Sequence, residues 1–122
     1  MNSRSRVLVV EDDPLVSEVV AAALDEDYET SLVDSSAAAL ERLSGGGVDL
    51  MLLDCTLPGG VDAHLIPTAD RSGVPVVLMS GDPERMEGLA GRSRPCILKP
   101  FTLSNLLLVV QTTIGGGVPA AE

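Results

Sequence analysis

Five side chains that can take part in polar chemistry each follow a short apolar run in this sequence. They are Asp12, Asp13, Asp54, Ser80 and Lys99. Asp54 comes after four apolar residues in a row and shortly before a Pro-Gly-Gly turn, and Lys99 is the only lysine in the chain. An unbroken apolar run that stops at a polar residue is typical of a strand buried on both faces, so each of these residues is expected at a strand end.

Acids, a hydroxyl and a lysine in one crevice would suit phosphoryl transfer. Carboxylates about 4 Å apart repel by about 4 kcal/mol per pair at an effective dielectric near 20, so a cation must offset them. Mg²⁺ prefers such hard oxygen ligands, and Lys99 would neutralise part of the remaining charge and hold an anion. In that arrangement Asp54 would attack phosphorus in line. The alternatives are a helix cap for Asp12 and Asp13, a turn cap for Asp54 and an ordinary strand end for Ser80.

The order of the predicted elements brings these residues together. Strands are predicted at residues 6–10, 28–33, 49–54, 74–79 and 96–98, and helical patterns follow them. Such alternation predicts an α/β fold with a flavodoxin-like, doubly wound (βα)5 parallel sheet in strand order 2-1-3-4-5. Strands one and three flank the switch point of that order, where Asp12, Asp13 and Asp54 would meet with Ser80 and Lys99 beside them.

Helix signals are clearest at the first and last helices. Asp13 followed by Pro14 predicts an N-cap and a first helical residue, and Thr102 or Ser104 would cap the last helix. Pro67 should end or kink the weak helix expected over residues 62–71, and Asp82-Pro83 predicts a further helix start. The apolar face predicted for the first helix comprises Leu15, Val16, Val19, Val20, Ala23 and Leu24. The stripe predicted for the last comprises Leu103, Leu106, Leu107, Val110 and Ile114.

Composition limits the class of protein. The chain has 122 residues, enough for one domain, which we expect to span residues 1–114 with a flexible tail at 115–122. A net charge of −10 argues against binding DNA or an anionic membrane surface. No apolar run approaches the roughly 18 residues of a membrane span. Cys55 and Cys96 suggest no disulfide framework, so a soluble cytoplasmic protein is expected.

The motifs, taken in order, resemble the response-regulator receiver domain of two-component signalling, of a stand-alone type. They are the stretch from Val7 to Pro14, the step from Asp54 to Pro58, Ser80, and Lys99-Pro100-Phe101. The resemblance covers essentially the whole chain. It implies a phosphoprotein that accepts a phosphoryl group on Asp54 from a histidine kinase or a histidine phosphotransfer protein in a phosphorelay. It also implies a signalling domain that catalyses at most its own phosphorylation and dephosphorylation.

The resemblance further implies roles for individual residues. Asp12, Asp13, Asp54 and the backbone carbonyl of Thr56 would bind Mg²⁺, while Ser80 and Lys99 would contact the phosphoryl group. The peptide before Pro100 is commonly cis in the family. The chain departs from the family at Cys96, where an aromatic residue that reorients on activation usually stands, and in the longer stretch of residues 60–63.

Two other functions remain open at this point. A constitutive interaction module without switching would explain Cys96, and Mg²⁺-dependent phosphorylation would discriminate against it. A phosphatase with an aspartyl nucleophile is disfavoured, because Thr56 stands where such enzymes place a second acid. Leu108 and Val109 fall off the apolar stripe of the last helix, which suggests a homodimer surface there. His64 is expected to be exposed and Cys55 to be a buried filler.

Overall fold

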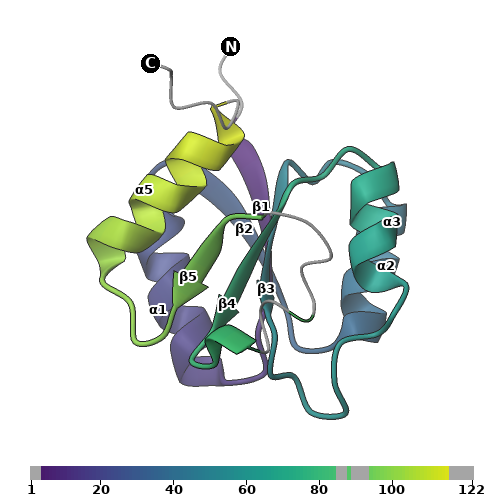
Figure 1. The fold of residues 1–122 in the computed structure, drawn as a ribbon. Helices are drawn as coiled ribbons and strands as arrows, with labels where there is room; N and C mark the ends of the chain where they lie inside the picture. The colour runs from purple at the N-terminus through teal and green to yellow at the C-terminus, as the bar shows by residue number, and fades with distance from the viewer. Residues whose placement is uncertain (1–3, 85–87, 89–93, 116–122) are drawn as a thin grey trace.

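A computed structural model describes residues 4–84, 88 and 94–115 of the chain (Figure 1). Five parallel strands form one sheet in the order β2-β1-β3-β4-β5, which confirms the predicted fold. The strands are β1 (Ser5–Val10), β2 (Tyr28–Val33), β3 (Leu50–Asp54), β4 (Val76–Ser80) and β5 (Cys96–Leu98). The described helices are α1 (Pro14–Leu24), α2 (Ser36–Ser44), α3 (Leu65–Arg71) and α5 (Leu103–Ile114). The helix predicted after Pro83 falls mostly outside the described residues, as does most of the predicted tail.

The sheet is covered on both faces. Helices α1 and α5 lie on one face and α2 and α3 on the other (Figure 1). Every residue of β3 and β4 is buried, because both strands lie inside the sheet with helices on either side. Leu52 and Met79 pack in the core cluster that includes α1 and α5, while Leu53 and Leu78 pack in the cluster on the opposite face. This explains why these strands read as unbroken apolar runs.

Helix α1 begins as its sequence predicts but turns a different face to the sheet. The Asp13 side chain accepts a hydrogen bond of 2.9 Å from the Leu15 backbone N–H, and Pro14 is the first helical residue. The fully buried positions of the helix are Ser17, Val20 and Leu24. The prediction for Leu15 and Val19 is wrong, since these side chains are 72% and 49% exposed. The apolar pattern of α1 is wider than the stripe that the sheet covers.

Pro67 does not end α3, which continues to Arg71. The helix begins only at Leu65, so Pro67 stands in its first turn. The backbone N–H groups of a first turn have no partner within the helix, and proline therefore costs little there.

Helix α5 is capped by Thr102, whose side chain accepts a hydrogen bond from the Asn105 N–H at 3.0 Å. Leu106 and Val110 are buried as predicted, whereas Leu103 is 48% exposed and does not belong to the core. Leu108 is 60% exposed, as expected, but Val109 packs partly against the core cluster. Among the described residues, no helix has both the length and the apolar character needed to cross a membrane.

Candidate functional site

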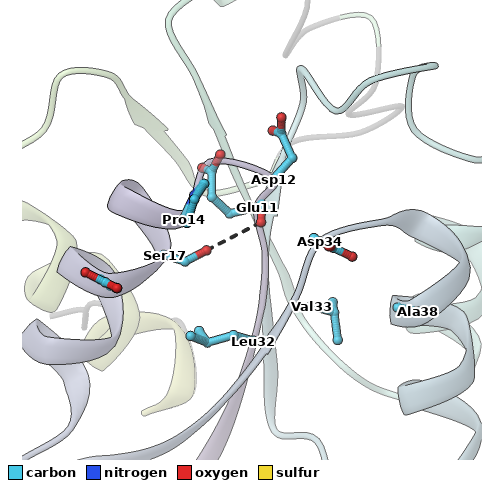
Figure 2. A pocket seen from close by; sticks show the side chains of 9 residues that line it. Glu11, Asp12, Pro14, Ser17, Leu32, Val33, Asp34 and Ala38 are labelled. Atoms are coloured by element: carbon cyan, nitrogen blue, oxygen red, sulfur yellow. Dashed lines mark hydrogen bonds between the residues drawn. The ribbon is translucent and has the colours of Figure 1, made fainter.

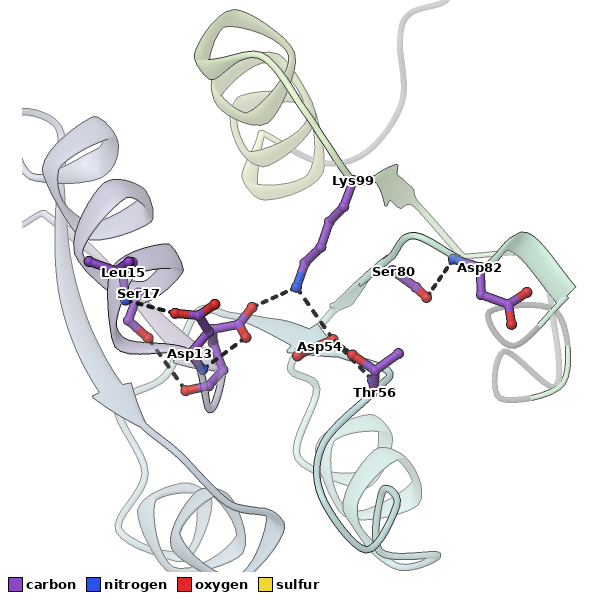
Figure 3. A network of polar contacts seen from close by, with 9 residues as sticks. Asp13, Leu15, Ser17, Asp54, Thr56, Ser80, Asp82 and Lys99 are labelled. Carbon is purple, nitrogen blue, oxygen red and sulfur yellow. Dashed lines mark hydrogen bonds and ion pairs between the residues drawn. The ribbon is translucent and has the colours of Figure 1, made fainter.

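The polar residues singled out in the sequence gather at the carboxyl edge of the sheet. Asp54 is the last residue of β3 and Ser80 the last residue of β4, while Lys99 directly follows β5. The register pairs Val10 with Leu53, so the residues after β1 lie beside the end of β3. Figure 3 shows the Lys99 side chain reaching across this edge toward Asp54.

Asp54 is a buried carboxylate with several donors around it. Its side chain is 2% exposed, and Oδ1 accepts hydrogen bonds from the Thr56 backbone N–H at 3.0 Å and the Thr56 hydroxyl at 2.8 Å. The Lys99 Nζ lies 3.6 Å from the same oxygen. Burial alone would raise the pKa of Asp54, but the Thr56 hydrogen bonds, the neighbouring Glu11 carboxyl and the Lys99 charge together hold it below 3.8. Asp54 is therefore ionised at neutral pH.

Glu11 is a site residue that the sequence reasoning missed. Its side chain is 1% exposed, and Oε1 accepts a 2.8 Å hydrogen bond from the Lys99 ammonium. The backbone N–H of Glu11 donates to the Val33 carbonyl at 3.0 Å, which directs the chain inward just beyond β1. Burial raises the pKa of Glu11 and the Asp54 charge adds to the effect, while Lys99 offsets only part of it. The signal that could have found Glu11 is its position as the first residue after the apolar run.

Lys99 is the cation shared by these two buried carboxylates. Burial by itself would lower the pKa of Lys99, yet the hydrogen bond to Glu11 and the charges of Asp54 and Glu11 raise it above 10.5. Its backbone N–H donates to the Ser80 carbonyl at 3.0 Å, which fixes the end of β5 against β4. The Lys99–Pro100 peptide bond is cis, as the resemblance implied.

Three carboxylates form a group that could hold a metal ion. Oxygen atoms of Glu11, Asp12 and Asp54 all lie within 4.8 Å of one another, with Asp12 exposed and the other two buried. One ammonium faces three negative groups, so the site has an excess of negative charge made only of hard oxygen donors. This donor set fits Mg²⁺. The structure does not bring Asp13 into the group, because its carboxylate caps α1, and a metal role for Asp13 stays a prediction without geometric support.

Ser80 and Thr56 occupy the places predicted for them beside Asp54. Ser80 is completely buried, and its Oγ accepts a 2.9 Å hydrogen bond from the Asp82 backbone N–H (Figure 3). Thr56 begins the loop after β3, where Gly60 donates from its N–H to the Leu57 carbonyl at 2.8 Å. Gly59 has φ of +78° within that turn, a conformation that favours glycine. The roles of Ser80 and of the Thr56 carbonyl remain predictions.

An open pocket adjoins the carboxylates between α1 and α2 (Figure 2). Its cavity measures about 530 Å³. The residues that line it are Glu11, Asp12, Pro14, Ser17, Glu18, Leu32, Val33, Asp34 and Ala38. The Ser17 hydroxyl donates to the Glu11 carbonyl at 3.4 Å on one wall (Figure 2). Because Glu11 and Asp12 line this pocket, the acidic group can be reached from the molecular surface.

The remaining candidates are the two cysteines and the single histidine. Cys96 is exposed on β5 and its thiol donates to the Arg94 carbonyl at 3.3 Å. The surrounding protein covers part of the sulfur, and this partial desolvation raises its pKa above 9.0. A raised pKa lowers the thiolate fraction, which disfavours a redox sensor at this position. Cys55 is buried next to Asp54, and the His64 side chain is 83% exposed, both as expected.

Comparisons with known proteins agree with this geometry. A family model described as the response regulator receiver domain matches residues 7–111. The chain is 32% identical over 117 residues to the DNA-binding response regulator MtrA of Mycolicibacterium smegmatis, covering 91% of this chain and 51% of that protein. It is 33% identical over 107 residues to the transcriptional regulatory protein TcrA of Mycobacterium tuberculosis, covering 83% and 42%. The chain thus spans about half the length of these curated relatives.

Solved structures show the same fold. A CheY-like response regulator receiver domain protein from Methanospirillum hungatei has a TM-score of 0.81 at 23% identity, with 93% of this chain and 95% of that chain covered. A response regulator receiver protein from Sinorhizobium medicae has a TM-score of 0.84 at 19% identity, with 93% and 97% covered.

Proposed function

Because this chain belongs to the response regulator receiver domain family of two-component systems, we propose that it accepts a phosphoryl group on Asp54. The donor would be a histidine kinase or a histidine phosphotransfer protein, and Mg²⁺ would be the cofactor. The observation that supports this most is a buried Asp54 side chain at a strand end, with Lys99 3.6 Å away and two further carboxylates beside it. We also propose that residues 1–114 form the receiver domain, within which the family match falls.

The proposed reaction is a displacement at phosphorus. An Asp54 carboxylate oxygen forms a bond to phosphorus, the bond from phosphorus to the imidazole nitrogen of a phosphohistidine breaks, and the leaving imidazole takes up a proton. The Thr56 hydroxyl and backbone N–H hold Oδ1 and so fix the orientation of the carboxylate. Lys99 would provide positive charge for the phosphoryl oxygens. The Ser80 hydroxyl, which accepts from Asp82, still has a hydrogen that it can donate to them.

The residues proposed to hold Mg²⁺ are Asp12 and Asp54, with Glu11 next to them and the Thr56 carbonyl as a further ligand. Glu11 takes the place first given to Asp13, because its carboxylate lies in the group while Asp13 caps α1. When bound, the ion would supply positive charge that offsets the crowded carboxylates and the phosphoryl oxygens.

Intact-protein mass spectrometry after incubation with phosphoramidate, with and without Mg²⁺, tests this function. We expect one added phosphoryl group that requires the metal and is absent from Asp54→Asn. Asp27→Asn is the matched control. Asp27 is exposed just before β2, at the amino ends of the strands, whereas Asp54 lies at their carboxyl ends. An adduct on Asp54→Asn, or none on the parent protein, would contradict the proposal.

A constitutive interaction module is the second candidate, and Cys96 is the observation that favours it. Cys96 stands where the family usually has an aromatic switch residue. Its thiol is exposed and donates a hydrogen bond to the carbonyl of Arg94, just before β5. In either case the proposed output is contact with other proteins, including a homodimer through Leu108 and Val109. Sedimentation velocity before and after phosphorylation separates the two, because a constitutive module would bind its partner or itself equally in both states.

A further inference from the structure

Strand β2 forms an open edge of the sheet. All six of its residues pair with β1, and no described strand lies on its other side. The Val33 carbonyl accepts from the Glu11 N–H on the β1 side. Because the backbone groups of successive strand residues point to opposite sides, those of Ser31 also face β1, whereas the N–H and C=O groups of Thr30 and Leu32 face outward. We call these outward-facing groups of Thr30 and Leu32 the β2 edge.

The residues of β2 do not block the addition of another strand. Natural sheet edges are commonly protected by proline, lysine or a bulge. The six residues of β2, all of them described, include neither proline nor lysine, and their register with β1 is unbroken. The one charged side chain of the strand, Glu29, pairs with Arg6 on β1 at 3.4 Å. Leu32 is 46% exposed, so an extended segment that pairs with the β2 edge would also cover an apolar side chain.

The pocket of Figure 2 lies at the carboxyl end of this edge and defines the charge of the occupant. Leu32, Val33 and Asp34 line it from β2 and the residue that follows, between α1 and α2. Asp12 and Glu18 line it as well, and both are exposed, as is Asp34. Of the described residues that line the pocket, none is basic. The complement is an arginine side chain, whose guanidinium can bind more than one carboxylate.

We propose that an extended segment of a partner protein adds to the β2 edge as a further, antiparallel strand and places an arginine from its amino-terminal end in this pocket. Antiparallel pairs are slightly more stable than parallel ones, and an antiparallel segment brings its first residues to the carboxyl end of β2. A second copy of the chain is a poorer occupant, because its net charge of −10 would bring acids against acids. The inference goes beyond the proposed phosphoryl transfer and does not depend on it.

A synthetic peptide tests the strand addition. The probe is a blocked peptide of six residues, the length of β2, with arginine first and valine and threonine alternating after it. Heteronuclear NMR measures both its binding and the hydrogen exchange of individual amides. Bound peptide should slow exchange several-fold at the N–H groups of Thr30 and Leu32. The N–H groups of Ser31 and Val33, which already face β1, should change little.

Two altered peptides separate backbone pairing from charge. A peptide that is N-methylated at the alternate amides facing β2 cannot donate to the edge and should not bind. A peptide with citrulline, the neutral analogue of arginine, should bind about fivefold more weakly, as expected for the loss of one ion pair in water.

Three variants locate the contact. Asp34→Asn should weaken binding of the arginine peptide by about the same factor and leave that of the citrulline peptide unchanged. Asp25→Asn removes an equal charge at the opposite end of α1 and should leave both unchanged. Thr30→Pro removes an outward donor and none that faces β1, so this variant should keep its circular dichroism spectrum and lose peptide binding. Should Thr30→Pro fail to fold, the N-methylated peptide answers the same question.

Each contrary result has a definite meaning. Absence of saturable binding, or binding without slower exchange at Thr30 and Leu32, would overturn the strand addition. Equal affinity for the arginine and citrulline peptides would overturn the role of the pocket. Self-association that slows exchange at the same two amides without peptide would assign the β2 edge to a second copy instead. Phosphoryl uptake by Asp54 is measured separately, so its failure would leave this inference standing.

Discussion

Replacing Asp12 by asparagine should stabilise the metal-free protein. Asp12 is the exposed member of the acidic group, and the other two members, Glu11 and Asp54, are buried and paired with Lys99. The substitution keeps the size of the side chain and removes one negative charge without disturbing those pairs. The free energy of unfolding should therefore rise, because repulsion within the folded state falls.

The magnitude follows from the separation of the oxygens, which is at most 4.8 Å. At that distance one pair of charges repels by about 3.5 kcal/mol at an effective dielectric of about 20 and by about 0.9 kcal/mol in bulk water. Because Asp12 is exposed, the lower figure applies to each of its two pairs, and attraction to Lys99 offsets part of the sum. A net gain of about 1 kcal/mol corresponds to a rise in Tm of about 3–5 °C for a domain of this size.

Thermal unfolding by circular dichroism in chelator at low ionic strength measures this shift, with Asp27→Asn as the matched loss of one negative charge elsewhere. Adding Mg²⁺ should raise the Tm of the parent protein more than that of Asp12→Asn, because binding to the folded state stabilises it. A Tm of Asp12→Asn below that of the parent in chelator would refute the reasoning. So would equal stabilisation of both proteins by Mg²⁺.

The pKa shifts and ion pairs lead to three further expectations. Without metal, the free energy of unfolding should fall as pH rises above 4.5 through the raised pKa of Glu11, because the folded state holds that proton more tightly than the unfolded state. Urea unfolding at about pH 5 and about pH 7 should show this fall in the parent and not in Glu11→Gln. Cys96 should be alkylated by iodoacetamide in the native protein, but more slowly than free cysteine at the same pH, because its pKa is raised. Cys55 is buried and should react only after unfolding, and peptide mapping checks both expectations. Asp70→Asn should lower the free energy of unfolding by roughly 1–3 kcal/mol, because the Arg94 side chain is only 7% exposed and donates to both Asp70 oxygens. An unchanged free energy of unfolding in a urea titration would show that this ion pair does not stabilise the fold.

The fold was predictable because its signals are local. Buried strands such as β3 read as apolar runs, and the caps at Asp13 and Thr102 are marked by residue type. When strands and helices alternate along the chain, right-handed crossovers allow only a few sheet topologies. The strand order could therefore be predicted from the order of the elements. Pro67 was misjudged because its effect depends on where α3 begins, and no capping side chain marks that boundary: His64, the N-cap residue, makes no side-chain cap hydrogen bond.

The sequence predicted that Asp12, Asp54 and Lys99 would lie close together, while the residues that bind a metal stay a prediction. Asp54 and Lys99 stand at strand ends, which sequence can locate. Asp13 was predicted both to cap α1 and to bind the metal, and the structure shows the cap. Glu11 lies inside the site because its backbone continues the course of β1 against Val33, a tertiary contact that spacing along the chain does not reveal.

Exposure on the helices was the least predictable feature. Helical periodicity identifies apolar residues but does not say whether a sheet or a partner covers them. Leu15, Val19 and Leu103 all fit an apolar stripe, and all three are exposed. Their exposure could therefore be learned only from the structure.

The scarcity of aromatic residues gives this protein very little intrinsic fluorescence, and this low background is useful. The chain has no tryptophan, and its one tyrosine, Tyr28, is buried at the start of β2, at the edge of the sheet opposite Asp54. Its single phenylalanine, Phe101, lines a cavity together with Lys99 and the α1 residues Leu15 and Val19. A Phe101→Trp protein would therefore carry a single indole beside Lys99, and its emission would report on that cavity with no second indole in the chain.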